Sequence, residues 1–425
     1  MSFQPDAVAE QLLARLRARG FDQAQASVGE RRRCELNLAH NQPSLMRSTE
    51  SRRAAASGIV GGRKASAEGT DLSQAGLATL VDELWAAAAS APVDEAHAVS
   101  AGQTLSWVQG PPEADPSALA QALRTLLDWR AAHTPTVMIE EGYAAHVRSR
   151  SHLVTSDGSS IGRDLGCCEL SVFGLAREGG ATSSFNYAGG TAHALAEVPQ
   201  AFGVARMMQD LTHQVHTRAL GERFVGEVVL APDAVSDLIG WLMQQLTDGP
   251  LIDGSSLFRH RVGELVASPL LTLASRFDGP GCAPVSGDAF IAPATTLLES
   301  GRLTQLTPSL YGSRKTGLAH RPVAATGWEL KGGSTPLEAL IAAVPRGALV
   351  GRLSMGDPAP NGDFSGVVKN SFLIEGGRVG GALAETMVSG NVAQMLKDVL
   401  AVSAERIDSG TLALPWLRIG GLHFS

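Results

Sequence analysis

The fold is indicated most directly by residues 224–246, which read FVGEVVLAPDAVSDLIGWLMQQL. The first seven residues are a short apolar run of the kind that forms a buried strand, and a Pro-Asp turn follows them. Apolar residues then recur at helical spacing up to Leu246. This stretch therefore predicts a strand, a tight turn and an amphipathic helix.

The composition indicates a globular protein. The chain has 425 residues, 44% hydrophobic and 18% charged, which is enough for two or three domains with sizeable cores. Its net charge of −7 gives no electrostatic footprint for nucleic acid, so we expect no nucleic-acid partner, and we interpret the basic run Arg31–Arg33 as a solvated strand end. The sequence has neither a signal-peptide pattern nor an apolar run long enough to span a bilayer. We therefore expect no membrane partner and a cytoplasmic location.

The order of the predicted elements suggests four segments. These are an N-terminal α+β unit over residues 1–90, a connector over 91–115, a central α+β region with a long linker helix over 116–220, and a C-terminal β-rich domain over 221–425. The fold class is α+β, with an N-terminal α/β region packed on a larger, mostly antiparallel C-terminal domain.

Helices and strands are predicted from apolar periodicity and from turn residues. Helices are expected over residues 6–19, 72–90, 116–132, 197–220 and 391–403. In the first half, strands are expected over residues 22–28, 32–39, 44–60, 136–141, 144–150, 153–155 and 170–176. Hairpin tips are expected at residues 156–159, 299–302 and 375–378.

The C-terminal half contains several short blocks, which are Gly254–Leu257, Val262–Leu265, Phe277–Gly281, Leu297–Leu303, Tyr311–Gly317, Gly362–Gly366 and Val388–Asn391. Together these blocks are similar to the TldD/PmbA family, once called modulators of DNA gyrase. Each block is weak alone, and their order and spacing carry the resemblance. A Gly-Pro turn and Cys282 replace the family's more acidic turn, which indicates a divergent member.

The helix within residues 224–246 resembles the one that carries a His-Glu-x-x-x-His zinc site in the family's catalytic branch. Gly240, Trp241 and Gln245 stand at roughly those places, and none of them can replace an imidazole or a carboxylate on zinc. Nowhere in the chain is a His followed by Glu. The chain therefore resembles the partner branch, PmbA/TldE, and no catalytic residue is assigned.

The resemblance implies a role in an assembly. We expect a homodimer, or a heteromer with a TldD-like zinc subunit, that encloses a chamber and degrades unfolded or ribosomally made peptides in the cytoplasm. The sibling subunit would supply the zinc, and this chain would bind no cofactor itself. An extended peptide would bind by strand addition, with low sequence selectivity.

Two groups of residues are candidates for a site. His213 and His216 are weak metal candidates, because residues at i and i+3 share a helix face, and a surface pair on the linker helix is the favoured interpretation. Asp363, Phe364 and Ser365, with Asn391, are candidates for a substrate cavity or an interface. Turn closure by Asp363 and Ser365 on their own backbone amides, and helix capping by Asn391, explain the same residues structurally.

Two other functions stay open. The first is a metallopeptidase in its own right with a non-standard metal site, for which bound zinc and inhibition by chelation would be the evidence. The second is a non-enzymatic binding protein that modulates DNA gyrase, although the acidic charge argues against direct contact with DNA.

Overall fold

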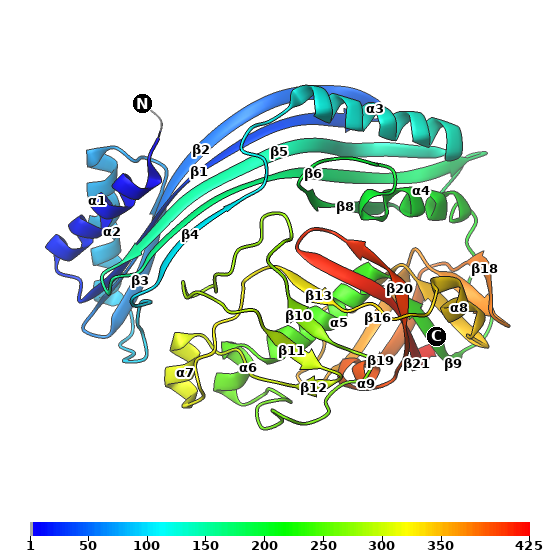
Figure 1. Cartoon of the computed structure of the whole chain (residues 1–425). Helices are drawn as coiled ribbons and strands as arrows, with labels where there is room; N and C mark the ends of the chain where they lie inside the picture. The colour runs from blue at the N-terminus through cyan, green and yellow to red at the C-terminus, as the bar shows by residue number, and fades with distance from the viewer. Residues whose placement is uncertain (1–2) are drawn as a thin grey trace.

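The structure, a computed structural model, describes residues 3–425 as two halves, each built on one sheet (Figure 1). The N-terminal half contains an 8-stranded sheet and the C-terminal half a 13-stranded sheet. The long strands of the first sheet arch over the C-terminal half (Figure 1). The predicted α+β class, with a mostly antiparallel C-terminal domain, is confirmed.

The N-terminal sheet is formed by β1 Gln23–Ala39, β2 Gln42–Val60, β3 Arg63–Gly69, β4 Thr104–Gln109, β5 Val137–Thr155, β6 Ser160–Glu178, β7 Ala181–Thr182 and β8 Asn186–Ala192. Its order is β3-β2-β1-β5-β6-β4, and β7 and β8 also pair with β6. All neighbours are antiparallel except β4, which runs parallel to β6. The segment predicted as a connector, 91–115, thus contributes an edge strand.

The strands of this sheet are longer than predicted. The separate strands expected over 22–28 and 32–39 are one continuous strand, β1, and the three expected over 136–155 are one strand, β5. Polar residues interrupt the apolar alternation in both segments, which is why the sequence indicated breaks. The breaks do not form because β1 pairs with β2 and β5 along nearly its whole length. Its backbone N–H and C=O groups therefore keep their hydrogen-bond partners even where the side chains are polar.

Three helices pack on this sheet as predicted: α1 Pro5–Arg19, α2 Gln74–Ser90 and α3 Pro116–His133. The first ends at Gly20, which has a left-handed φ of 106°. The second begins where the Ser73 hydroxyl accepts from the Gly76 N–H, and the third is capped by Asp115. Helices α1 and α2 lie at one end of the arch and α3 at the other (Figure 1).

The predicted long helix over 197–220 is wrong. The structure has a 3-10 turn, η1 Ala201–Gly203, followed by the short helix α4 Val204–His213. Glu197 and Phe202 have φ values of 48° and 56°, and Gly203 has 75°. A right-handed helix cannot pass through residues with these angles.

The C-terminal half begins with the predicted strand–turn–helix, observed as β9 Phe224–Leu230 and α5 Pro232–Gln245. Two strand pairs are parallel, β9 with β14 and β13 with β21, and the other pairs are antiparallel. The remaining strands are β10 Leu273–Ser275, β11 Thr296–Glu299, β12 Arg302–Leu303, β13 Trp328–Leu330, β14 Arg346–Val350, β15 Arg352–Ser354, β16 Asp363–Lys369, β17 Phe372–Glu375, β18 Arg378–Ala382, β19 Thr386–Asn391, β20 Val399–Asp408 and β21 Leu412–Phe424. The remaining helices are α6 Asp248–Asp253, α7 Leu310–Thr316, α8 Leu337–Ala342 and α9 Val392–Lys397.

The turns of the C-terminal half largely follow prediction, and its last helix does not. The tips at 299–302 and 375–378 join β11 to β12 and β17 to β18, as expected. The helix predicted over 391–403 is only six residues long, because the chain from Val399 onward pairs with β21 as β20. The apolar residues from Val399 onward belong to strand β20, although their spacing also fits one face of a helix.

The two halves meet through side chains of the connector segment. The Trp107 indole N–H donates to the Cys282 carbonyl at 3.0 Å, and the Gln109 amide donates to the Phe277 carbonyl at 2.9 Å. Asp94 accepts from the Tyr311 hydroxyl at 2.9 Å. Among residues 3–425 there is no helix with the length and apolar character that crossing a membrane requires.

Candidate functional site

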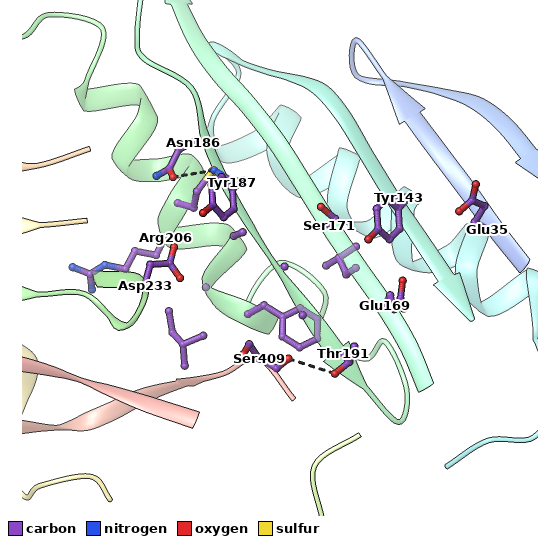
Figure 2. A pocket seen from close by; sticks show the side chains of 18 of the residues that line it. Glu35, Tyr143, Glu169, Ser171, Asn186, Tyr187, Thr191, Arg206, Asp233 and Ser409 are labelled. Atoms are coloured by element: carbon purple, nitrogen blue, oxygen red, sulfur yellow. Dashed lines mark hydrogen bonds between the residues drawn. The ribbon is translucent and has the colours of Figure 1, made fainter. Parts of the chain in front are cut away.

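A cavity of about 1040 Å³ lies between the N-terminal sheet and the C-terminal half. One wall is formed by residues of β1, β2, β5 and β6, and another by β8 and α4. The third side comes from C-terminal segments near Asp233, Gly351, Ser409 and Trp416. Figure 2 shows Glu35, Tyr143 and Glu169 on one side, with Tyr187, Arg206 and Asp233 grouped on the other.

The sheet wall carries a ladder of alternating charges. Glu35 is buried and pairs with Arg33 and Arg47, while Glu169 pairs with Arg33 and, at 3.5 Å, with Arg31. Three guanidinium groups facing two carboxylates leave one positive charge on this wall. Burial alone would raise the pKa of Glu35, but hydrogen bonds from the two arginines lower it to about 2. Glu35 therefore stays ionised at neutral pH.

The interpretation of Arg31–Arg33 as a solvated strand end was wrong for Arg33. Its side chain is 18% exposed and its guanidinium lies 4.6 Å from the centroid of the Tyr143 ring. The spacing of Arg31, Arg33 and Glu35 at i, i+2 and i+4 places all three on one face of a strand, and this spacing was the missed signal.

The opposite wall centres on α4. The Arg206 guanidinium lies over the Trp416 ring and 3.8 Å from the Asp210 carboxylate. Burial raises the pKa of Asp210 to about 6, against the opposing effects of Arg206 and His213. The Trp416 indole nitrogen is buried, and no residue in the described part of the chain accepts its hydrogen. This wall thus combines the Arg206 guanidinium, the Asp210 carboxyl group and the unpaired indole N–H of Trp416.

The edge of β8 completes the cavity. The Tyr187 N–H bonds to the Asn186 side-chain oxygen at 2.9 Å and the Thr191 N–H to the Ser409 carbonyl at 3.0 Å, so both point away from β6. Backbone direction alternates along a strand, so the N–H and C=O of Gly189 point the same way. Both groups of Gly189 lack a protein partner within residues 3–425. Strand β8 therefore presents the unpaired N–H and C=O of Gly189 to the cavity.

His213 and His216 do not share a helix face. The first is the last residue of α4, and the second follows the helix end, 3.9 Å from the Glu178 carboxylate. Both line a separate cavity of about 630 Å³. No group of three potential His, Cys, Asp or Glu ligands is found in the part of the chain that the structure describes.

The residues at 363–365 lie in a strand, outside the large cavity. Asp363 accepts from the side-chain amides of Asn361 at 2.7 Å and Asn391 at 2.8 Å, and these bonds lower its pKa. The predicted closure on its own backbone amides is not observed. Phe364 is buried in the core and Ser365 is exposed.

Asn391 serves as the helix cap that was predicted. Its side-chain oxygen accepts from the Gln394 N–H at 3.0 Å at the start of α9. Its amide nitrogen also donates to the Asn361 carbonyl at 2.8 Å. Together with Asp363, it ties β16 to β19 at the residue where the two strands pair.

The α5 positions that resemble the zinc motif do not fit a metal. Gly240 is exposed, while Trp241 is buried with its ring edge-on to Phe258 at 6.0 Å. The Gln245 side-chain oxygen accepts from the Leu257 N–H at 3.1 Å. The Trp241 side chain is thus engaged in packing and the Gln245 side chain in a hydrogen bond, and neither of them is a zinc ligand.

Comparison with known proteins identifies the C-terminal half by sequence. Residues 225–425 match the family described as PmbA/TldA metallopeptidase C-terminal domain. No curated protein matches the chain at a significant level.

Similar solved structures extend over the whole chain. TldE from Thermococcus kodakarensis aligns with 98% of this chain and 100% of its own, with a TM-score of 0.84 and 18% identity. A proposed modulator of DNA gyrase from Bacteroides thetaiotaomicron aligns with 99% of this chain and 98% of its own, with a TM-score of 0.85 and 17% identity. A corresponding protein from Thermotoga maritima covers 99% of each chain, with a TM-score of 0.80 and 16% identity. Residues 225–425 therefore belong to the PmbA/TldA metallopeptidase C-terminal domain family, and the chain as a whole shares the fold of these solved structures.

Proposed function

We propose that this chain is a PmbA/TldE-like subunit of a cytoplasmic TldD/TldE-type metalloprotease complex acting on unfolded or ribosomally made peptides. In this proposal the chain holds peptide in the large cavity, and a TldD-like sibling supplies the zinc. The main support is α5, where Trp241 and Gln245 serve packing and hydrogen bonding at positions resembling the zinc motif. Likeness in fold to TldE from Thermococcus kodakarensis agrees with this assignment.

The cavity suits an extended peptide. A strand added beside β8 would bond through its backbone to Gly189, whose N–H and C=O face the cavity. Backbone bonding selects weakly among sequences, which suits a subunit that meets many unfolded chains. Arg31 is the most weakly paired cation of the sheet wall, so its guanidinium would be available to bind a peptide carboxylate.

The zinc of the complex is expected to provide the Lewis acid and the activated water. The residues of this chain would bind the peptide, orient its backbone and limit access of water. Its role is therefore in positioning substrate, with hydrolysis assigned to the sibling.

The complex is tested by metal analysis and a peptidase assay, with the chain alone and then mixed with a sibling that carries His-Glu-x-x-x-His. We expect hydrolysis of an unstructured peptide only in the mixture, with zinc in proportion to the sibling. Stoichiometric zinc and full hydrolysis by the isolated chain would overturn the proposal.

Strand addition is tested with peptides rather than with protein variants, because a side chain at Gly189 would clash with the Leu170 carbonyl. Two sets of peptides of one sequence, N-methylated at alternate residues in the two possible phases, are compared in binding to the complex. One set should bind at least several-fold more weakly, because it loses donors that face β8. Equal binding by both sets would contradict strand addition.

A further inference from the structure

A second cavity, of about 630 Å³, lies where the chain that leaves α4 passes beside the end of β18 (Figure 1). Its volume is in the range that small-ligand sites have in proteins. Arg206 and Asp210 line both this cavity and the large one, and its other lining residues do not line the large cavity. It is therefore distinct from the site proposed for peptide.

One side of this cavity is apolar. Leu349 and Phe372 are buried, and both belong to one core cluster of the C-terminal half. Ile341 packs partly buried against the same cluster, and Val379 adds an apolar side chain that is 44% exposed. A ligand in this cavity would therefore cover apolar surface and remove it from water, which favours binding.

The other side of the cavity carries charged and titratable groups from α4 and from the segment that follows it. Arg206, Asp210 and His213 recur at helical spacing, so they share one face of α4. His216 and Arg218 follow after the helix ends. Asp210 is the one carboxyl group among the residues that line the cavity, so a single acid faces two arginines.

Arg218 has no countercharge at this cavity. Among residues 3–425, the lining residues form two ion pairs. Arg206 lies 3.8 Å from the Asp210 carboxylate, and His216 lies 3.9 Å from that of Glu178. Arg218 takes part in neither pair. Because Asp210 neutralises Arg206, one positive charge remains in the cavity even when both histidines are neutral.

The position of Arg218 is fixed by its neighbours. Its N–H donates to the Ala382 carbonyl at 2.8 Å, and its carbonyl accepts from the Ala384 N–H at 2.8 Å. Its Cδ lies 3.4 Å from the place that a Cβ of Gly381 would occupy, so its side chain lies across this glycine. Backbone bonds and the lack of a bulky side chain at residue 381 therefore hold the arginine beside β18.

We propose that this cavity binds a carboxylate that carries an apolar group, either a small organic acid or the C-terminal residue of a peptide. The carboxylate would accept charge-assisted hydrogen bonds from the Arg218 guanidinium. The apolar group would pack against Phe372 and Val379. A metal ion is disfavoured in this cavity, because the excess charge is positive. The site needs neither the zinc sibling nor strand addition beside β8, so it does not rest on the proposed function.

The first test is calorimetric titration of the purified chain with phenylpropionate and with N-acetyl-Ala-Ala-Phe, each compared with its amide. We expect at least one acid to bind with a Kd at or below about 1 mM, and its amide to bind about tenfold more weakly, because the amide has no charge. The acid that binds more tightly identifies the source of the carboxylate. Acetate, which has no apolar group, should also bind about tenfold more weakly.

The second test uses variants of the chain. Arg218→Gln should weaken binding of the acid about tenfold, because it removes the charge that the carboxylate meets. Arg223→Gln removes the same charge from an exposed arginine outside the cavity and should leave the Kd unchanged. Arg218 is also exposed, so its replacement should leave the fold intact, as circular dichroism and thermal melting would show.

A third variant separates the position of Arg218 from its charge. Gly381→Val keeps the arginine but adds a branched side chain where the arginine now lies. It should weaken binding of the acid several-fold, whereas Gly381→Ala should weaken it less, because a Cβ alone makes only an ordinary contact with Arg218. The same calorimetric titration measures both variants.

Three results would overturn the proposal. The first is that neither acid binds the wild type. The second is that acid and amide bind equally. The third is that Arg218→Gln binds the acid as tightly as Arg223→Gln, which would place the ligand elsewhere in the molecule. None of these measurements uses the zinc sibling or peptide hydrolysis, so failure of this inference is distinguishable from failure of the proposed function.

Discussion

Arg206 on α4 lies over the indole ring of Trp416 on β21, with its guanidinium carbon 5.1 Å from the ring centroid. Helix α4 packs in the core of the N-terminal half, while β21 runs through the C-terminal sheet. A cation over an aromatic face is attracted by the negative potential of that face. The pair therefore holds the two halves together beside the cavity.

Arg206→Ala should lower the free energy of unfolding by about 1 kcal/mol, because it removes this contact and leaves Asp210 without its nearest cation. The measurement is urea denaturation at neutral pH. Arg53→Ala, an exposed arginine on β2, is the control and should change stability by less than about 0.5 kcal/mol. Equal stability of both variants would contradict a role for the Arg206–Trp416 contact.

Glu35→Gln should lower the free energy of unfolding, and the size of this loss should depend on pH. The folded pKa of Glu35 is lowered from 4.5 to about 2, so its ionised form stabilises the fold above pH 4.5 and this contribution is lost as the pH falls toward 2. We expect the free energy of unfolding to fall by about 1–2 kcal/mol at pH 7. This loss is smaller than the pKa shift alone implies, because solvent screens the partly exposed arginines that pair with Glu35.

Thermal and urea unfolding between pH 3 and 7 would measure this change. The difference between Glu35→Gln and wild type should shrink below pH 4.5. Glu50→Gln, whose side chain is 42% exposed, serves as the control for loss of an arginine-paired carboxylate. A pH-independent difference would show that packing, and not ionisation, is lost.

Asp210→Asn should raise the free energy of unfolding at neutral pH, whereas Glu35→Gln lowers it. Burial raises the pKa of Asp210 from 3.8 to about 6, so the fold is favoured below pH 3.8 and this advantage is lost as the pH rises through 6. Removing the acid should therefore raise the free energy of unfolding at pH 7 by about 1–3 kcal/mol.

The gain from Asp210→Asn should vanish at or below pH 3.8, where both folded and unfolded chains are largely protonated. Chemical denaturation at the two pH values measures it. Asp82→Asn, whose side chain is 69% exposed, is the matched control. A loss of stability at pH 7 would mean that the attraction to Arg206 outweighs burial.

Asn391→Ala should lower the free energy of unfolding by about 1–2 kcal/mol, because it removes the cap of α9 and both bonds of the side-chain amide. Asn391→Ser keeps a capping oxygen and should recover about half of the loss. Ser389→Ala, on an exposed neighbouring position of β19, is the control for the strand itself. Guanidinium denaturation distinguishes the three variants.

Local signals in the sequence were sufficient for several elements. The strand and helix within 224–246 follow from a short apolar run, Pro232 and helical periodicity. Gly20 and Ser73 mark a helix end and a helix start by interactions with residues close to them in sequence. The helix cap formed by Asn391 was recognised for the same reason.

The elements that were wrong depend on distant partners. The apolar residues after Val399 fit a helix until β21 pairs with them, and no local pattern shows that pairing. The linker helix fails because Phe202 adopts a left-handed angle, which follows from how the chain packs against both halves.

By itself, the sequence determined the α+β class, the family resemblance and the lack of a zinc motif on α5, because these depend on residue type and short spacing. Only the tertiary structure decided where the cavity lies and which residues line it. Arg33, Arg206 and Trp416 come from three distant parts of the chain. Side-chain chemistry is set locally, but proximity between such residues exists only after the sheets have formed and packed.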